Sequence, residues 1–126
     1  MTILYLAAPY SDPSPEVRNA RVELASRAAA YLMEQGFVVF SPITHGHYVA
    51  DHLPDTCRLD HEFWMKQCLP FLDRSHGLVI LPLPGWESSR GIQAERRRAE
   101  DLNIPELFMP LDLPEAFLSL LKETLS

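Results

Sequence analysis

The chain has 126 residues, enough for one hydrophobic core of two or three layers and too few for two separate domains. Eleven Lys and Arg against 17 Asp and Glu give a formal net charge of -6, which opposes docking on DNA, RNA or an anionic membrane. This charge balance argues against nucleic acid polymers and lipid surfaces as partners, and leaves a small anionic ligand in a local pocket open.

The cysteines and the apolar runs bear on the compartment. Two cysteines, Cys57 and Cys68, in a sequence without the pattern of a secretory leader predict a reducing compartment rather than a disulfide scaffold. The longest apolar runs, LYLAAP and GLVILPL, have the length of a strand and are shorter than a membrane span. We therefore expect a cytoplasmic protein with a single domain over residues 1–126.

The first half of the chain alternates between strand and helix. Residues 2–9, TILYLAAP, form an apolar run that ends at a proline, which is typical of a strand buried on both faces. Ser14 before Pro15 predicts the start of a helix, and Gly36 predicts its end. A second strand is predicted over residues 37–42, and residues 43–56 are expected to be irregular.

The second half continues the alternation. A helix is predicted from near Asp60 to Leu72, with Pro70 kinking or shortening its last turn. Further along the chain, the pattern predicts a strand, a helix, a strand and a final amphipathic helix over residues 77–83, 90–102, 106–111 and 114–125.

Regular alternation predicts the fold class. We expect a three-layer α/β fold, Rossmann-like or flavodoxin-like, with a parallel sheet of about four to five strands and helices on both faces. In such sheets ligands bind beyond the carboxyl ends of the strands. A ligand is therefore expected at residues 8–12, 41–52 and 84–95, which follow the first three strands.

The stretch GWESSRGIQAE, residues 85–95, lies where the third strand passes to the third helix. With Ser89 as N-cap, the free N–H groups and the positive end of the helix dipole would form a site for an anion or a hydroxyl group. Gly91 leaves open space one turn before Glu95, so that the Glu95 carboxylate can reach a ligand at the helix start. Alternatively, Glu95 is an ordinary surface acid that the helix dipole or Arg98 stabilises.

Tyr5 in ILYLAAPYS, together with Ser89, Gly91 and Glu95 in SRGIQAE and the GW before them, resembles the nucleoside 2-deoxyribosyltransferase-like superfamily. The superfamily includes nucleoside 5'-monophosphate N-glycosidases. The chain is similar to an uncharacterised bacterial branch in SPITHGHYVA, HEFWM and LPGWESSRG, and the resemblance runs from Tyr5 to about Pro110.

The resemblance implies cleavage or transfer at the N-glycosidic bond of a nucleoside or nucleotide. Glu95 would attack the anomeric carbon and form a covalent glycosyl ester, which water or a second base resolves. Tyr5 would orient this carboxylate by a hydrogen bond, unless Tyr5 is a core tyrosine with a satisfied hydroxyl. Ser89 would hold the 5' end of the sugar or a phosphate there, or would be a plain N-cap. No metal or organic cofactor is required, and many relatives complete their sites across a dimer interface, which implies a homo-oligomer.

Cys68 departs from the superfamily pattern, because an aspartate usually stands at the corresponding place on the helix before the third strand. A thiol is a weak donor with an ordinary pKa of about 8.5, so that it replaces a carboxyl group poorly. The proton for the departing base would then come from His45, His47 or Asp60, or the chain is a nucleotide-binding or sensing domain without turnover. Cys68 can equally be a small apolar residue on a buried helix face.

Other side chains are expected to line the same cleft. Tyr10 and Trp86 would stack on a nucleobase, although Trp86 can equally cover the core. Arg90, beside the capping serine, is a better phosphate ligand than residues 96–98, because three successive arginines span nearly a full helical turn.

The segment HGHYVADH, residues 45–52, contains three histidines and an aspartate. His45, His47 and Asp51 would be the ligands if the chain were a metal-dependent hydrolase. The spacing differs from the H-x-H-x-D-H string of metallohydrolases, because Asp51 comes four residues after His47 rather than two. The alternatives are polar residues on a mobile loop, and histidines that contact the substrate or transfer a proton to it.

Overall fold

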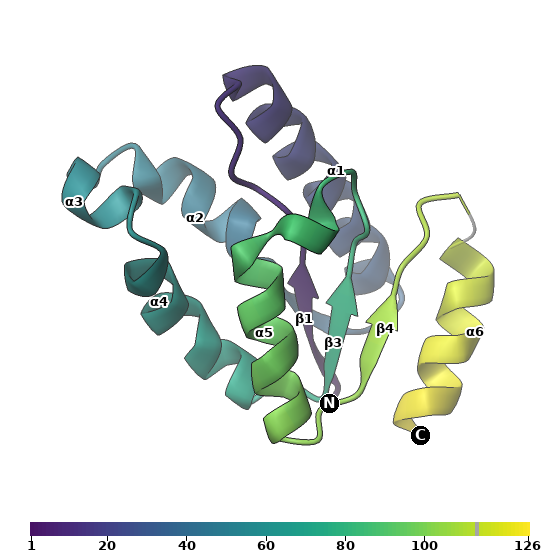
Figure 1. Ribbon diagram of the computed structural model, residues 1–126. Coiled ribbons are helices and arrows are strands. Elements are labelled where there is room, and N and C mark those ends of the chain that lie inside the picture. The colour runs from purple at the N-terminus through teal and green to yellow at the C-terminus, as the bar shows by residue number, and fades with distance from the viewer. Residues whose placement is uncertain (113) are drawn as a thin grey trace.

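The computed structural model describes residues 1–112 and 114–126, and four strands in this part of the chain form one parallel sheet. The strands are β1 (Ile3–Ala7), β2 (Val38–Phe40), β3 (Gly77–Ile80) and β4 (Glu106–Phe108). Their order across the sheet is β2-β1-β3-β4. Figure 1 shows β1, β3 and β4 side by side, with their arrows pointing to the same end. The predicted Rossmann-like α/β fold is confirmed, and the strand order is that of the flavodoxin-like type.

Two pairs of helices complete the three layers. α1 (Pro15–Glu34) and α6 (Pro114–Leu125) pack on one face of the sheet, and α4 (His61–Asp73) and α5 (Arg90–Asp101) pack on the other. The predicted final helix agrees with α6. Each helix of the α4 and α5 pair precedes or follows β3, as short crossover connections between parallel strands require.

Alternate residues of β1 point to different faces, as the period of a strand requires. Leu4 and Leu6 belong to the core under α1 and α6, whereas Tyr5 and Ala7 belong to the core under α4 and α5. Both cores are largely aliphatic, and burying such side chains stabilises the fold by roughly 25 cal/mol per Å² of apolar surface. Tyr5 is therefore the polar exception at the centre of the sheet.

The predicted helix starts are confirmed where a capping residue stands before the helix. The Ser14 hydroxyl accepts a hydrogen bond from the N–H of Val17 at 3.4 Å, directly before Pro15. Pro70 does not shorten α4, which continues to Asp73. Proline removes the N–H that would bond the carbonyl of Lys66, and both residues are exposed, so that water can satisfy this carbonyl.

The prediction that residues 43–56 are irregular is wrong. α2 (Pro42–Ala50) and the single turn α3 (Asp55–Arg58) occupy most of it. The physical reason is the same as at α1: Ser41 stands before Pro42, and proline at the first helical position is pre-set for the helix. Gly46 within α2 is explained by packing, because a Cβ there would lie 3.2 Å from the Trp64 ring.

A single arginine joins two loops at the carboxyl end of the sheet. The Arg21 guanidinium donates to the carbonyls of Tyr10 at 3.3 Å and Ser11 at 3.0 Å, in the loop after β1. It also donates to the carbonyl of Pro84 at 2.9 Å, in the loop after β3. β1 and β3 are the neighbours at which the strand order reverses, which is where ligands bind in this type of sheet.

The helices of the structure differ from those that span a bilayer. None of them, within residues 1–112 and 114–126, combines the length and the apolar character needed to cross it.

Candidate active site

Glu95 lies on the buried face of α5. The buried residues of this helix are Ile92, Glu95 and Ala99, which follow one another at helical spacing. The Ser89 hydroxyl caps the helix by accepting from the N–H of Ile92 at 3.3 Å, as predicted. An acid thus occupies a position that an amphipathic helix normally gives to an apolar side chain, and its side chain is 4 % exposed.

Tyr5 is the hydrogen-bond partner of this acid. The fully buried Tyr5 hydroxyl donates a hydrogen bond to Oε2 of Glu95. Arg98, the alternative partner considered for Glu95, pairs with Asp73 instead, through two hydrogen bonds of 2.7 and 2.8 Å. The interpretation of Glu95 as a surface acid is therefore wrong.

Burial changes the proton affinity of both groups. Burial raises the pKa of the Glu95 carboxyl from its ordinary value of 4.5 to about 7, and the hydrogen bond from Tyr5 acts in the opposite direction. Burial, followed by the charge of Glu95, raises the pKa of the Tyr5 hydroxyl well above its usual value. At neutral pH the tyrosine keeps its proton as a donor, while the carboxyl is poised between its two forms.

Cys68 of α4 completes this buried group. Its side chain is 5 % exposed, and burial, followed by the charge of Glu95, raises the pKa of the thiol to about 11. The thiol therefore stays protonated at neutral pH and carries no charge into the group. Cys68 does lie beside Tyr5 and Glu95, in the place where the superfamily resemblance expects an aspartate.

Gly91 leaves space beside the start of α5. A Cβ at this position would meet the Cε of Met65 at 3.8 Å and the Oγ of Ser89 at 4.0 Å, which are ordinary contacts. The space at Gly91 is therefore about the size of a methyl group and is bordered by Met65, whereas open space was expected there. Arg90, the first residue of α5, is exposed.

Two of the three arginines at residues 96–98 form ion pairs. Arg96 makes two hydrogen bonds to Glu106, at 2.9 and 3.0 Å, and Arg98 makes the pair with Asp73 described above. Two of the three guanidinium groups are thus already bonded to a carboxylate, whereas Arg97 is exposed.

Trp86 contacts the β4 side of the sheet. Its ring lies edge-on to Phe108, with centroids 5.1 Å apart, and the Arg96 guanidinium stands 5.6 Å from each of the two ring centroids. Trp86 also packs on the core that contains Tyr5. Of its two predicted roles, the structure supports a cover over the core.

The histidines of α2 take separate places. Tyr10 and His47 form a hydrogen bond of 2.8 Å between the hydroxyl and Nδ1, and this bond joins the loop after β1 to α2. The exposed His45 lies beside Phe40, with ring centroids 5.7 Å apart, and Phe40 in turn contacts Tyr5. Residues two apart on a helix point to different sides, which is why His45 and His47 do not converge.

A metal centre at His45, His47 and Asp51 receives no support from this geometry. Over residues 1–112 and 114–126, no three His, Cys, Asp or Glu side chains are grouped so that they could hold a metal ion. Asp51 ends α2 as its C-cap residue.

Two residues beside the site were not found from the sequence. Met65 has no polar group, and its only signal is the spacing of three residues to Cys68, which places both on one face of α4. Arg21 has the appearance of a surface residue of α1, and the carbonyls that it bonds are distant in sequence.

Comparison with known proteins gives a family and no activity. No curated protein matches the chain. The family model described as a domain of unknown function, DUF1937, matches residues 2–109, a range that includes Tyr5, Cys68 and Glu95. Since this range covers most of the chain and the whole of the buried group, the protein belongs to the DUF1937 family.

Proposed function

We propose that the protein cleaves or transfers the N-glycosidic bond of a nucleoside or nucleotide, with Glu95 as the nucleophile. The observation that carries the proposal is the buried carboxyl of Glu95, which is bonded by Tyr5 and has no cationic partner among the described residues. Burying an acid without a cationic partner costs folding free energy. Acids with such strongly perturbed pKa values cluster at functional sites, where the cost is offset by a task in binding or catalysis.

The chemistry asks for a carboxylate whose second oxygen is available. Tyr5 bonds Oε2, so that Oε1 can attack the anomeric carbon as the bond to the base breaks. The negative charge stabilises the oxocarbenium-like transition state, and a glycosyl ester on Glu95 follows. Water then completes a hydrolase, and a second base completes a transferase.

The rest of the proposal concerns the ligand. Ser89 with Gly91 and Arg90 would hold the 5' end of the sugar or its phosphate, at the capped start of α5. Proton delivery to the departing base would come from a histidine or an acid at the rim, since the Cys68 thiol holds its proton with a pKa of about 11. A cytoplasmic homo-oligomer belongs to the same proposal, as does the absence of a required cofactor.

Cys68 favours a second candidate function. A nucleotide-binding or sensing domain needs the pocket and the anion site but no acid to protonate the leaving base. A neutral thiol where the superfamily resemblance expects a carboxyl group is compatible with such a domain.

Base release decides between the two candidates. We expect the wild-type protein to release base from at least one member of a panel of nucleosides and their 5'-monophosphates, measured by chromatography. Glu95→Gln should be roughly a thousandfold slower, because an amide cannot form the ester. The matched control is Glu100→Gln, an exposed acid of the same helix, which should keep the wild-type rate.

The pH profile separates the nucleophile from its positioning residue. The rate should rise as Glu95 ionises, with a midpoint about pH 7. Tyr5→Phe removes the bond that lowers the pKa of Glu95, so its midpoint should lie at higher pH. A wild-type protein that binds nucleotides but releases base from none of them would establish the sensing domain instead.

A further inference from the structure

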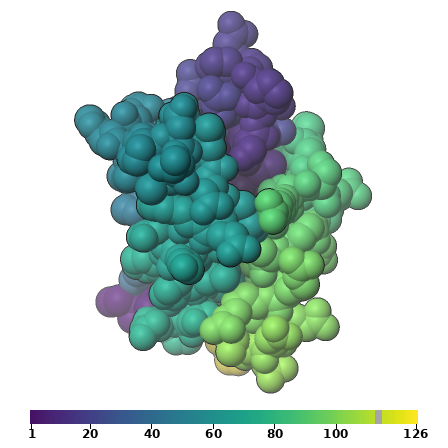
Figure 2. Space-filling model, turned by 60° about the vertical axis from the view of Figure 1, so that its left-hand side comes forward, coloured from purple at the N-terminus to yellow at the C-terminus, as the bar shows by residue number. Residues whose placement is uncertain are grey.

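A surface cavity of about 420 Å³, largely open to solvent, lies between α4 and α5. Figure 2 shows the surfaces of these two helices, teal and green, directly beside one another. The volume falls within the range that small-molecule sites have in proteins. The cavity is lined by residues of both helices: His61, Glu62, Met65, Lys66, Leu69, Pro70, Asp73 and Arg98.

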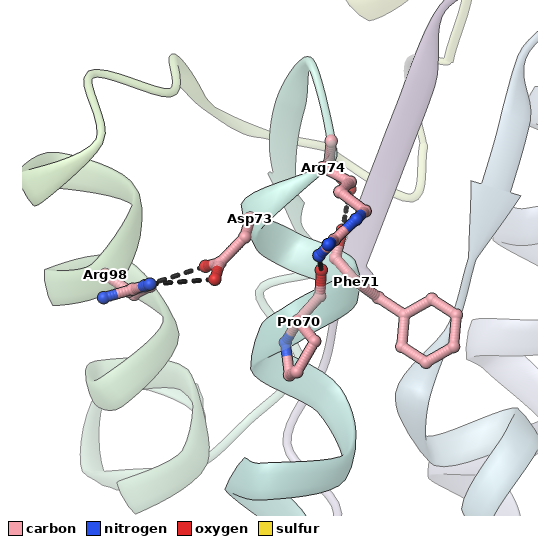
Figure 3. Close-up of polar contacts among 6 residues, drawn as sticks. Pro70, Phe71, Asp73, Arg74 and Arg98 are labelled. Carbon is pink, nitrogen blue, oxygen red and sulfur yellow. Dashed lines mark hydrogen bonds and ion pairs between the residues drawn. The ribbon is translucent and has the colours of Figure 1, made fainter.

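The two helices are held together at one end of this cavity. Figure 3 shows Asp73 of α4 and Arg98 of α5 joined by two hydrogen bonds, and both residues line the cavity. A planar guanidinium that binds both oxygens of a carboxylate fixes orientation as well as distance. The amino-terminal end of the cavity has no such bond between the helices among the described residues, and there Met65 faces Gly91.

Met65 belongs to the wall of the cavity and approaches Gly91, one turn before Glu95. α4 and α5 run parallel, since Met65 lies by Gly91, Cys68 by Glu95, and Asp73 by Arg98. Met65 and Cys68 are three residues apart on one face of α4, so the Met65 side chain lies one turn above the Cys68 and Glu95 level. Leu69, the other apolar residue of the wall, packs against the same core.

The Met65 side chain is of a kind that a ligand can displace. Methionine is unbranched, has three rotatable bonds and changes rotamer at low cost. Gly91 has no side chain, which leaves room of about one methyl group beside the Cε of Met65, 3.8 Å from the Cβ position. In the present arrangement Glu95 is 4 % exposed and Cys68 5 % exposed, so a ligand in the cavity reaches neither group.

We propose that Met65 is a gate between the cavity and Glu95, and that the sugar of the substrate reaches the carboxylate by displacing it. The identity of the ligand rests on the proposed function, whereas the gate does not. Asp73 and Arg98 keep the far end of the cavity closed while the Met65 end opens.

Cys68 reports on the gate without any assay of activity. In a Cys57→Ser background Cys68 is the one remaining thiol, and its reaction with a small methanethiosulfonate reagent can be followed by intact mass. We expect Met65→Ala to react at least about tenfold faster than this parent, because the side chain that covers the thiol is gone. Met65→Leu, which restores the volume, should bring the rate back toward that of the parent.

Two controls exclude a general loss of stability as the cause. Met33→Ala removes an exposed methionine of α1 and should leave the rate unchanged. Labelling through local opening should depend little on low concentrations of urea, whereas labelling through global unfolding rises steeply with urea. A Met65→Ala rate no faster than the parent rate, or one that follows the urea dependence of global unfolding, overturns the gate.

Added nucleotides make the failure of the two proposals distinguishable. Nucleosides and their 5'-monophosphates should slow the labelling of Met65→Ala, because an occupied site covers Cys68. Fast labelling that none of them slows keeps the gate and contradicts the proposed substrate class. Slow labelling of Met65→Ala contradicts the gate, whatever base-release assays show.

Discussion

At the scale of single residues, the protein keeps a carboxyl group where apolar side chains are expected. Glu95 shares its level of the core with Tyr5 and Cys68, and none of the three brings a positive charge. The carboxyl therefore depends on one hydrogen bond and on its own proton for stability in the folded state. This arrangement couples the stability of the protein to pH.

The pKa of Glu95 sets the direction of that coupling. Between pH 4.5 and about 7 the folded protein holds a proton on Glu95 that the unfolded chain has lost, so stability falls as the pH rises through this window. The total loss is on the order of 3 kcal/mol. Urea unfolding at a series of pH values should show this slope in wild type and in Glu100→Gln, and a flat line over the window in Glu95→Gln. A slope that persists in Glu95→Gln would assign the coupling to another group.

At the scale of elements, the site depends on where α5 begins. Ser89 gives α5 its first side-chain bond, and the residue before it belongs to the short 3-10 helix η1 (Trp86–Ser88). The capping bond fixes the turn that carries Gly91, and through it the rotation of the helix that directs Glu95 to Tyr5.

Removing this cap should cost the protein stability. Ser89→Ala is expected to lower the free energy of unfolding by about 1 kcal/mol, since an N–H at the helix start loses its acceptor. Ser88→Ala is the matched control. The exposed Ser88 hydroxyl bonds the carbonyl of Gly85, and its removal should lower the free energy of unfolding by only about a few tenths of a kcal/mol. Equal losses in urea unfolding would show that Ser89 is no more than another surface serine.

The sequence predicted those elements whose ends are marked by local chemistry. Ser14 with Pro15 and Ser89 as N-cap both gave the correct starts of helices. α2 was missed although Ser41 with Pro42 carries the same signal, because its histidines and Gly46 hide the helical period. Gly46 is understood only from Trp64, a residue of another helix, and no local pattern contains that contact.

The candidate site was predictable in part for the same reason. Ser89, Gly91 and Glu95 lie within one turn and a half, so spacing alone placed them together. The contact of Trp86 with Phe108 depends on which strand lies beside β3, and alternation of strands and helices does not determine strand order. Met65 and Arg21 act through packing and through backbone carbonyls, which leave no signature in a sequence.

At the scale of the whole molecule, Arg21 holds the rim of the sheet together. Its three carbonyl partners come from the loops after β1 and β3, which flank the point where the strand order reverses. Gly85, beside one of these carbonyls, has a φ of 95° in the left-handed region. A Cβ there would stand 2.9 Å from Nη2 of Arg21.

Two glycines allow this role to be measured. Gly36 has a φ of 96°, nearly that of Gly85, but nothing lies within 4 Å of its Cβ position. Gly36→Ala should therefore cost only the left-handed backbone, about 1–2 kcal/mol. Gly85→Ala should cost up to about 1 kcal/mol more, because the guanidinium must shift and weaken its bond to the carbonyl of Pro84. Equal losses of unfolding free energy would mean that Arg21 moves aside freely and does not hold the loops.

The distance along the chain between Tyr5 and Glu95 has a consequence for how the protein folds. The two residues are 90 positions apart, one in the first strand and one in the helix after the third. Until α5 docks, this face of the sheet is open to water, which bonds the hydroxyl in place of the carboxylate. The docking of α5 therefore takes both groups out of water together, and it must first close a loop of most of the chain.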